Sequence, residues 1–146
     1  MIIPIASDHA GYPAKEMAKA LLEALGHEPL DYGTHSDASV DYPDYAILVA
    51  HAVAKGEYER GILICGSGQG MAMTANRIAG VRAALVWNPD IATLSVQHNN
   101  ANVLCLPGRY LSSDEMNSIL QNWLGATFEG GRHANRVNKI HSLTSC

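Results

Sequence analysis

Ile62-Leu63-Ile64-Cys65-Gly66-Ser67-Gly68-Gln69-Gly70 is the stretch on which the fold depends. Its apolar first half is typical of a strand that is buried on both faces of a parallel sheet. The glycines that follow permit a tight turn with bare N–H groups, and residues 69–79 predict a helix. A strand, a glycine turn and a helix N-terminus form a site for an anion, because free N–H groups and the helix dipole point at it. Cys65 thus ends a strand where open α/β sheets bind ligands.

Strands and helices alternate along the rest of the chain. Apolar runs predict further strands at residues 2–6, 28–31, 81–86 and 101–106. Helices are predicted to begin at Pro13, Tyr42, Pro89 and Ser112, with another near residues 134–140. One buried face of the first helix is expected to carry Met17, Ala18, Leu21, Leu22 and Leu25. This alternation predicts one α/β domain over residues 1–146, a three-layer αβα arrangement with a five-stranded parallel sheet.

Composition excludes several classes of protein. The 146 residues are 47% hydrophobic and 16% charged, which indicates a folded globular chain. The net charge of −4 gives no overall case for nucleic acid or for an anionic membrane as a partner. Three cysteines without clustered spacing argue against a disulfide framework and favour the reducing cytoplasm. We expect neither a signal peptide nor a membrane span, because no basic n-region and no long apolar run is present.

Cys65 is the first candidate for chemistry. A cysteine at the end of a buried strand is more often a small hydrophobic residue than a reactive one. Beside a nest of N–H donors, however, its thiolate would be stabilised and its pKa could fall toward neutrality. Such a thiolate can serve as a base or as a nucleophile. Cys105, inside a strand, and Cys146, at the chain end, are interpreted as unreactive.

The glycine turn after Cys65 is either a plain tight turn or a cradle for an oxyanion or a phosphate. It matches neither the P-loop nor the dinucleotide fingerprint. Asp8 and His9 follow the first strand and should lie at the same sheet edge as Cys65, whereas His98 precedes the fifth strand and should lie at the other edge. An overhanging helix or a second subunit could still deliver His98. We expect no metal, because these residues lack close ligand spacing.

A basic cluster lies near the end of the chain. Arg132 and Arg136 are one helical turn apart, follow two glycines, and have no acidic side chain after them. The cluster is either a solvated tail or a phosphate clamp, since arginine forks match phosphate oxygens. Arg109, which follows the fifth strand, could join such a clamp.

Five motifs together carry a resemblance to a known family. They are Asp8-His9-Ala10-Gly11, Asp41-Tyr42-Pro43, Ile64 to Gly70, Gln97-His98-Asn99, and Glu129-Gly130-Gly131-Arg132-His133 with Arg136-Val137. In this order they resemble ribose-5-phosphate isomerase type B, of the sugar-phosphate isomerase family that also holds galactose-6-phosphate isomerase subunits. The resemblance implies a Rossmann-like domain and a homodimer, or a dimer of dimers, with active sites at the interface. It also implies that residues 126–146 pack on the partner subunit.

The resemblance implies interconversion of D-ribose 5-phosphate and D-ribulose 5-phosphate through an enediolate, without a metal or cofactor. By this resemblance Cys65 moves the proton between C1 and C2, His98 opens the furanose ring, and Ser67 helps to shuttle protons. The implied substrate contacts are Asp8, His9, Tyr42 and Asn99, the amides of Gly66, Ser67, Gly68, Gln69 and Gly70, and, for the phosphate, Arg109, Arg132 and Arg136. One branch of the family has a glutamate base just after the loop, where this chain has Met71.

Other interpretations of the sequence remain open. An aldohexose 6-phosphate, such as allose or galactose 6-phosphate, is the main alternative substrate. A non-catalytic sugar-phosphate-binding domain is another possibility, which the presence of both Cys65 and His98 argues against. A cysteine-nucleophile enzyme such as a thiol phosphatase would need an arginine inside the loop, and residues 66–70 contain none.

Overall fold

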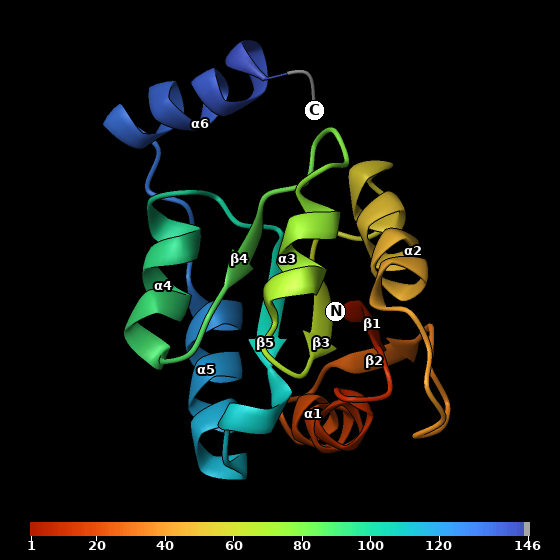
Figure 1. Ribbon diagram of the computed structural model, residues 1–146. Coiled ribbons are helices and arrows are strands. Elements are labelled where there is room, and N and C mark those ends of the chain that lie inside the picture. The colour runs from red at the N-terminus through yellow and green to blue at the C-terminus, as the bar shows by residue number, and fades with distance from the viewer. Residues whose placement is uncertain (145–146) are drawn as a thin grey trace.

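Residues 1–144 are described by a computed structural model, in which five strands form one parallel sheet (Figure 1). The strands are β1 (Ile2–Ser7), β2 (Glu28–Asp31), β3 (Gly61–Cys65), β4 (Ala83–Leu85) and β5 (Val103–Pro107). The helices are α1 (Tyr12–Ala24), α2 (Tyr42–Ala54), α3 (Gln69–Ala75), α4 (Pro89–Gln97), α5 (Ser113–Gly125) and α6 (Arg132–Leu143). The predicted five-stranded parallel sheet with helices on both faces is confirmed. Cys146 lies outside the described residues.

The strand order β2-β1-β3-β5-β4 creates a topological switch point between β1 and β3. The connection after β1 leads to one side of the sheet and the connection after β3 leads to the other. Ser7 pairs with Ile64, and Cys65 pairs with Pro107, so the carboxyl ends of β1, β3 and β5 lie level. Open α/β sheets bind ligands in the crevice at such a point. The fold therefore places the residues after β1 and β3 in the position of a binding site.

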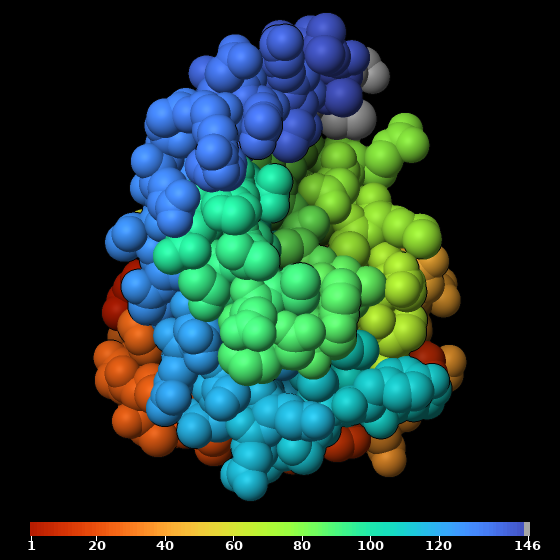
Figure 2. Space-filling view, turned by 90° about the vertical axis from the view of Figure 1, so that its left-hand side faces the viewer, coloured from red at the N-terminus to blue at the C-terminus, as the bar shows by residue number. Residues whose placement is uncertain are grey.

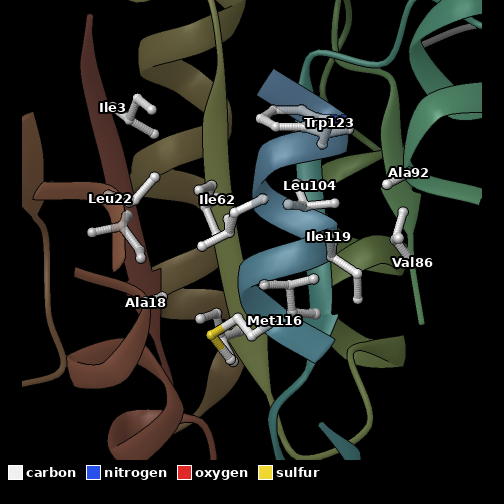
Figure 3. Packing of buried hydrophobic residues seen from close by; sticks show 14 of the residues in the cluster. Ile3, Ala18, Leu22, Ile62, Val86, Ala92, Leu104, Met116, Ile119 and Trp123 are labelled. Carbon is white, nitrogen blue, oxygen red and sulfur yellow. The ribbon is translucent and has the colours of Figure 1, made fainter. Parts of the chain in front are cut away.

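Two hydrophobic cores cover the two faces of the sheet. Alternate residues of a strand point to opposite faces, so Ile62 and Ile64 pack on one side while Leu63 and Cys65 pack on the other. The larger core lies under α1, α4 and α5 and includes Trp123 (Figure 3). The second core lies under α2 and α3. The side chain of Cys65 thus belongs to the α2 and α3 side of the sheet.

Some sequence predictions are wrong in detail. Met17 is 36% exposed, because the inward face of α1 follows the four-residue spacing of Ala14, Ala18 and Leu22. The helix predicted at residues 69–79 ends at Ala75. The side chain of the next residue, Asn76, bonds both the N–H and the carbonyl of Ala83, so the chain turns early toward β4. The edge strand β4 is correspondingly shorter than residues 81–86.

Helix α6 stands apart from the sheet, at the amino ends of the strands (Figure 1). It lies at the opposite end of the molecule from Cys65. In the space-filling view, α6 and the segment before it form the upper end, above α4 (Figure 2). Within residues 1–144, no helix is long and apolar enough to cross a membrane.

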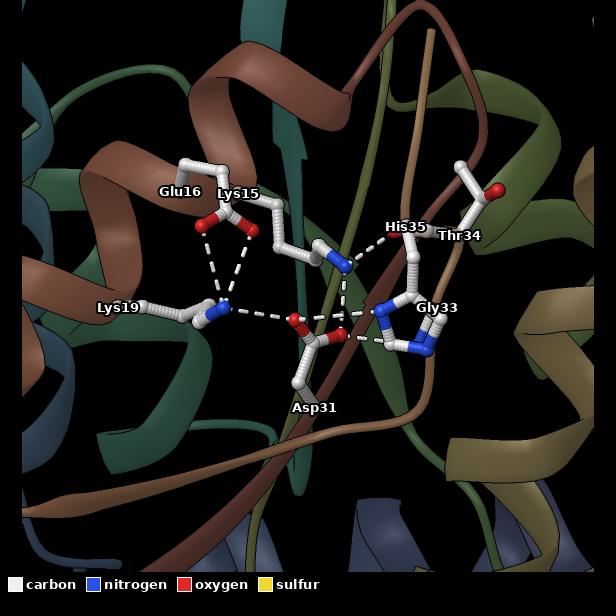
Figure 4. Close-up of polar contacts among 7 residues, drawn as sticks. All are labelled: Lys15, Glu16, Lys19, Asp31, Gly33, Thr34 and His35. Carbon is white, nitrogen blue, oxygen red and sulfur yellow. Dashed lines mark hydrogen bonds and ion pairs between the residues drawn. The ribbon is translucent and has the colours of Figure 1, made fainter. Parts of the chain in front are cut away.

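A buried lysine ties α1 to the end of β2 (Figure 4). The Nζ of Lys15, which has no exposed side-chain surface, donates to Asp31 Oδ1 and to the Thr34 carbonyl, both at 2.5 Å. Lys19 Nζ lies 2.8 Å from the other oxygen of Asp31. Backbone hydrogen bonds between Ser7 and the turn at residues 33–34 connect this network to the end of β1. Burial alone would raise the pKa of Asp31, but the hydrogen bonds from the two lysines outweigh it and lower the pKa to about 2.

We predict that Asp31→Asn removes part of the pH dependence of stability. A carboxyl with a lowered native pKa stabilises the fold above its unfolded pKa, and this contribution is lost as the pH falls from 3.8 toward about 2. The free energy of unfolding of Asp31→Asn should therefore fall less than that of the wild type over this pH range. At neutral pH its free energy of unfolding should be lower by roughly 3 kcal/mol, because Lys15 remains buried without a carboxylate.

Urea unfolding at a series of pH values measures both effects. Asp37→Asn, a change at an exposed carboxylate, is the matched control and should behave like the wild type. If the free energy of unfolding falls equally steeply toward acid pH in the wild type and in Asp31→Asn, the prediction is wrong.

Candidate active site

A cavity of about 350 Å³ opens at the carboxyl edge of the sheet, at the switch point between β1 and β3. Its walls come from the segments that follow β1, β3 and β5 and from the start of α2. The lining residues are Asp8, His9, Ala10, Tyr42, Cys65, Gly66, Ser67, Gly70, Arg109 and Tyr110. Eight of these ten residues are site candidates from the sequence.

Cys65 borders this cavity at the very end of β3. Its side chain is 5% exposed and packs in the core under α2 and α3. Cys105 lies in the same core with no exposure, and burial raises the pKa of its thiol far above the ordinary value. Cys105 therefore stays protonated and has no access to a ligand. Met71, at the position of the alternative glutamate base, is fully buried and apolar.

The glycine loop bends tightly because Gly68 adopts the left-handed conformation, with φ of 75°. Its Cβ position would lie 2.4 Å from Leu85 and 3.1 Å from the carbonyl carbon of Leu106, so the loop rests directly on its neighbours. The first N–H groups of α3, which begins after Gly68, have no acceptor within the helix. The ring of Tyr42 covers Gly70, whose Cβ position lies 2.6 Å from it. The loop thus exposes backbone donors beside an aromatic wall.

Asp8 and the start of α1 are held against β3. The Oδ1 of Asp8 accepts the N–H of Gly11 at 2.9 Å, and the Asp8 N–H donates to the Ile64 carbonyl at 3.3 Å. A Cβ on Gly11 would stand 2.3 Å from that same carbonyl oxygen. The carboxylate of Asp8, which is 6% exposed, is therefore fixed next to Cys65.

His9 and Arg109 complete the polar lining. His9 Nδ1 lies 3.2 Å from both the N–H and the carbonyl oxygen of Val40, so the ring can bond the backbone there in either neutral tautomer. Arg109 follows β5, and its N–H donates to the Gly66 carbonyl at 3.1 Å. Its guanidinium nitrogen lies 3.4 Å from the Cβ position of Gly66. A cation beside bare N–H groups favours an anionic ligand.

Six further candidates are not among the lining residues: Gly68 and Gln69 belong to the glycine loop itself, and the other four lie away from the cavity. His98 is the residue at which α4 ends, and Arg132 and Arg136 are exposed on α6. Asn99 lines a separate cavity of about 420 Å³, with Arg82 and His141 among its other walls. The prediction that His98 lies at the opposite sheet edge from Cys65 is confirmed.

His98 has neighbours that the sequence analysis missed. Its ring stacks on that of His133, with centroids 4.2 Å apart and planes 10° from parallel. Glu129 Oε2 lies 3.9 Å from His98 Nε2 and 3.5 Å from His133 Nε2. Desolvation and the neighbouring charges of His98 and Arg132 lower the pKa of His133. The motif at residues 129–133 contains both partners, but no periodicity connects it to a residue some thirty positions earlier.

Fold and cavity define a doubly wound α/β protein with a ligand cavity at its switch point. More particularly, residues 3–140 match the Ribose/Galactose Isomerase family, and the chain belongs to that family. The ribose-5-phosphate isomerase B of Escherichia coli is 45% identical, over 97% of this chain and 95% of that protein.

Solved structures agree with this assignment. The Clostridium thermocellum ribose-5-phosphate isomerase B superposes with a TM-score of 0.95 at 47% identity, over 98% of this chain and 97% of that one. The Mycoplasma genitalium enzyme with bound ribulose-5-phosphate has a TM-score of 0.92 at 45% identity, over 97% of this chain and 95% of that one.

We predict that Gly68→Ala destabilises the protein more than Gly26→Ala. Both glycines have positive φ, of 75° and 83°, so each change should cost roughly 1 to 2 kcal/mol of backbone strain. A Cβ on Gly26 meets nothing within 4 Å, whereas one on Gly68 collides with Leu85 and the backbone at Leu106. The collision should add about 1 to 3 kcal/mol. Equal unfolding free energies in urea for the two variants would refute this close approach.

Proposed function

We propose that the chain is an aldose–ketose isomerase that interconverts D-ribose 5-phosphate and D-ribulose 5-phosphate, a step of the pentose phosphate pathway. The observation that carries this proposal is the cavity at the switch point, where Cys65 meets the glycine loop. Membership of the isomerase family supports it, as do relatives named ribose-5-phosphate isomerase B. The structure with bound ribulose-5-phosphate is that of such a relative.

In the proposed reaction, the thiolate of Cys65 takes a proton from C2 of the open-chain aldose and returns it to C1. The hydroxyl on C2 becomes the ketone, and the carbonyl oxygen on C1 becomes a hydroxyl. Between these steps the substrate is an enediolate, whose negative charge the amides of residues 66–70 stabilise. One well-placed donor of this kind is worth about 3 kcal/mol. No metal or cofactor is needed for a proton transfer between adjacent carbons.

The other cavity residues have roles that follow from their chemistry. Ser67, exposed on the loop with its Oγ 3.4 Å from the Gln69 N–H, is placed to pass a proton between the substrate oxygens. Asp8, His9 and Tyr42 contact the sugar hydroxyls and carbon chain. Arg109 binds the phosphate or the developing negative charge, since its guanidinium borders the loop.

One chain does not bring both halves of the expected site together. His98 and Asn99, with Arg132 and Arg136 on α6, lie toward the amino end of the sheet, far from Cys65 in the fold (Figure 1). We therefore propose a homodimer, or a dimer of such dimers, in which this end of one chain completes the Cys65 cavity of the other. Apolar side chains exposed on α6 support this arrangement, because Ile140 is 45% and Leu143 is 79% exposed. The tail at residues 126–146 would pack on the partner.

Two further aspects belong to the proposal. We expect the enzyme to work in the cytoplasm, because a catalytic thiol must stay reduced and Cys65 and Cys105 are both free. An aldohexose 6-phosphate, such as allose or galactose 6-phosphate, is the second candidate substrate. The family includes galactose isomerases by name, and the cavity is open to solvent on one side. Turnover of a panel of pentose and hexose phosphates discriminates between the two.

We predict that Cys65→Ala loses isomerase turnover while the fold persists. Removing a general base costs roughly 10²- to 10⁴-fold in rate, and buried Met71 offers no replacement. Cys105→Ala is the matched control, since it removes a buried thiol from the same core and should keep turnover. Turnover and thermal unfolding are measured together. Activity of Cys65→Ala within tenfold of the wild type would exclude the thiol as the base.

We also predict that two inactive variants restore activity when mixed. An Arg132→Ala/Arg136→Ala chain lacks the phosphate clamp, and a Cys65→Ala chain lacks the base. If the site is shared between chains, a heterodimer contains one complete site and regains part of the turnover. Differently tagged chains allow heterodimer formation to be verified independently. Heterodimers that form but remain inactive would show that the arginines do not serve the partner's cavity.

A further inference from the structure

A group of possible metal ligands lies at the end of the molecule opposite the Cys65 cavity. It consists of His98, Glu129 and His133, here called the His98 cluster. One ligand atom from each residue lies within 4.8 Å of the other two. The carboxylate oxygen of Glu129 stands between the rings, 3.9 Å from His98 Nε2 and 3.5 Å from His133 Nε2.

These separations are close to those of a zinc site. Zinc binds imidazole nitrogen and carboxylate oxygen at about 2.0 to 2.2 Å, so neighbouring ligand atoms of a tetrahedral site lie about 3.4 Å apart. The observed 3.5 and 3.9 Å are close to this spacing. A metal lies in the plane of each imidazole that it binds, and the two rings are stacked only 10° from parallel, so binding requires the partly exposed His98 ring to turn out of the stack. Two imidazoles and one carboxylate suit zinc and similar transition metals better than magnesium or calcium, which prefer oxygen ligands alone.

Backbone contacts hold the two segments of the cluster together. The Glu129 N–H donates to the Gln97 carbonyl at 3.1 Å, which fixes the loop before α6 to the end of α4. The His98 N–H donates to Leu94 at 2.9 Å, and the His133 N–H donates to Gly130 at 3.0 Å. The positions from which the ligands project are thus set before any ion arrives, which lowers the cost of assembling the site.

Exposure and charge indicate a reversible site. The His133 side chain is 8% exposed, whereas those of His98 and Glu129 are 39% and 50% exposed. In a single chain an ion can therefore enter from solvent, and in the proposed dimer it can enter by the opening through which the substrate reaches the shared cavity. The ion would keep a coordination position for water, unlike the ion of a closed structural zinc site. Arg132 and Arg136 lie near enough to act on His133, and their charges oppose a dication. Binding should accordingly follow the concentration of free metal.

We propose that the His98 cluster binds a divalent transition-metal ion, preferentially zinc, and that this ion inhibits the enzyme by occupying His98. Coordination through Nε2 uses the lone pair of that nitrogen, and its proton moves to Nδ1 or to solvent. The ring can then no longer exchange a proton with the furanose oxygen. Inhibition, unlike binding, rests on the proposed function, because it requires His98 to open the sugar ring.

Binding is tested without any turnover. Metal-free full-length protein is titrated with zinc by calorimetry and with cobalt(II) by visible absorption, which reports a site of low coordination number. Glu129→Gln and His133→Asn should each weaken zinc binding by more than about tenfold. Mutation of a residue that only hydrogen-bonds a metal ligand already lowers metal affinity by about 10- to 100-fold, and these two residues are proposed as ligands themselves. Glu28→Gln and His51→Asn, at exposed residues elsewhere, are matched controls and should bind like the wild type.

Cys65 is the competing zinc ligand. Cys65→Ser should leave the affinity and the cobalt spectrum unchanged. A cobalt–thiolate charge-transfer band that disappears in this variant, or equal zinc affinity in wild type, Glu129→Gln and His133→Asn, would overturn the site.

Inhibition is tested with two substrates. Zinc should slow turnover of ribose 5-phosphate, which must be opened, at least tenfold more than turnover of an aldotetrose 4-phosphate, which cannot close to a furanose. Equal inhibition of both substrates would overturn the assignment to His98. Inactivity of the metal-free enzyme toward both substrates would refute the proposed function and leave the binding result standing.

Discussion

The close contact of α1 with β3 is the constraint on which the site depends. Gly11 places the start of α1 against the Ile64 carbonyl, at a distance that no side chain tolerates. The hydrogen bond from the Gly11 N–H to Asp8 closes the turn between β1 and α1 over the same carbonyl. A carboxylate and a thiol from two separate strands thereby border one cavity. The contact also determines how α1 lies on the sheet, and hence where Lys15 is buried.

The Lys15–Asp31 pair stabilises this contact by joining α1 to the end of β2. The Lys15 N–H donates to the Gly11 carbonyl, and the Lys15 ammonium donates to Asp31, at the end of β2, and to the Thr34 carbonyl. A buried ammonium is costly, and a carboxylate together with a carbonyl offsets that cost. The turn at residues 33–34 then bonds Ser7, the last residue of β1. The edge strand β2 thus contributes no residue to the cavity but holds the strand that does.

Sequence alone predicted the sheet and the two helix layers, because apolar runs and glycines report the local environment that they need. The eight cavity residues depended also on the resemblance to a known family, which alone indicated Tyr42. Met17 was misplaced because the exact rotation of α1 follows from packing that periodicity does not resolve. The buried Lys15 was not anticipated, since a lysine in a helix is normally interpreted as solvated. The stacking of His98 on His133 joins two segments distant in sequence, and such pairs depend on how α6 leaves the body of the fold.

The separation of the site into two groups has a physical rationale. Proton transfer between carbons needs a base and N–H donors held rigidly, and the carboxyl edge of a central strand provides that rigidity. The candidate residues for ring opening and for the phosphate clamp lie at a helix end and on α6, outside the packed sheet. Under the proposed function, neither group suffices alone, so assembly of two chains creates the catalyst. In each chain His98 also lies beside Glu129 and His133, so the residue proposed for ring opening is at the same time a candidate metal ligand.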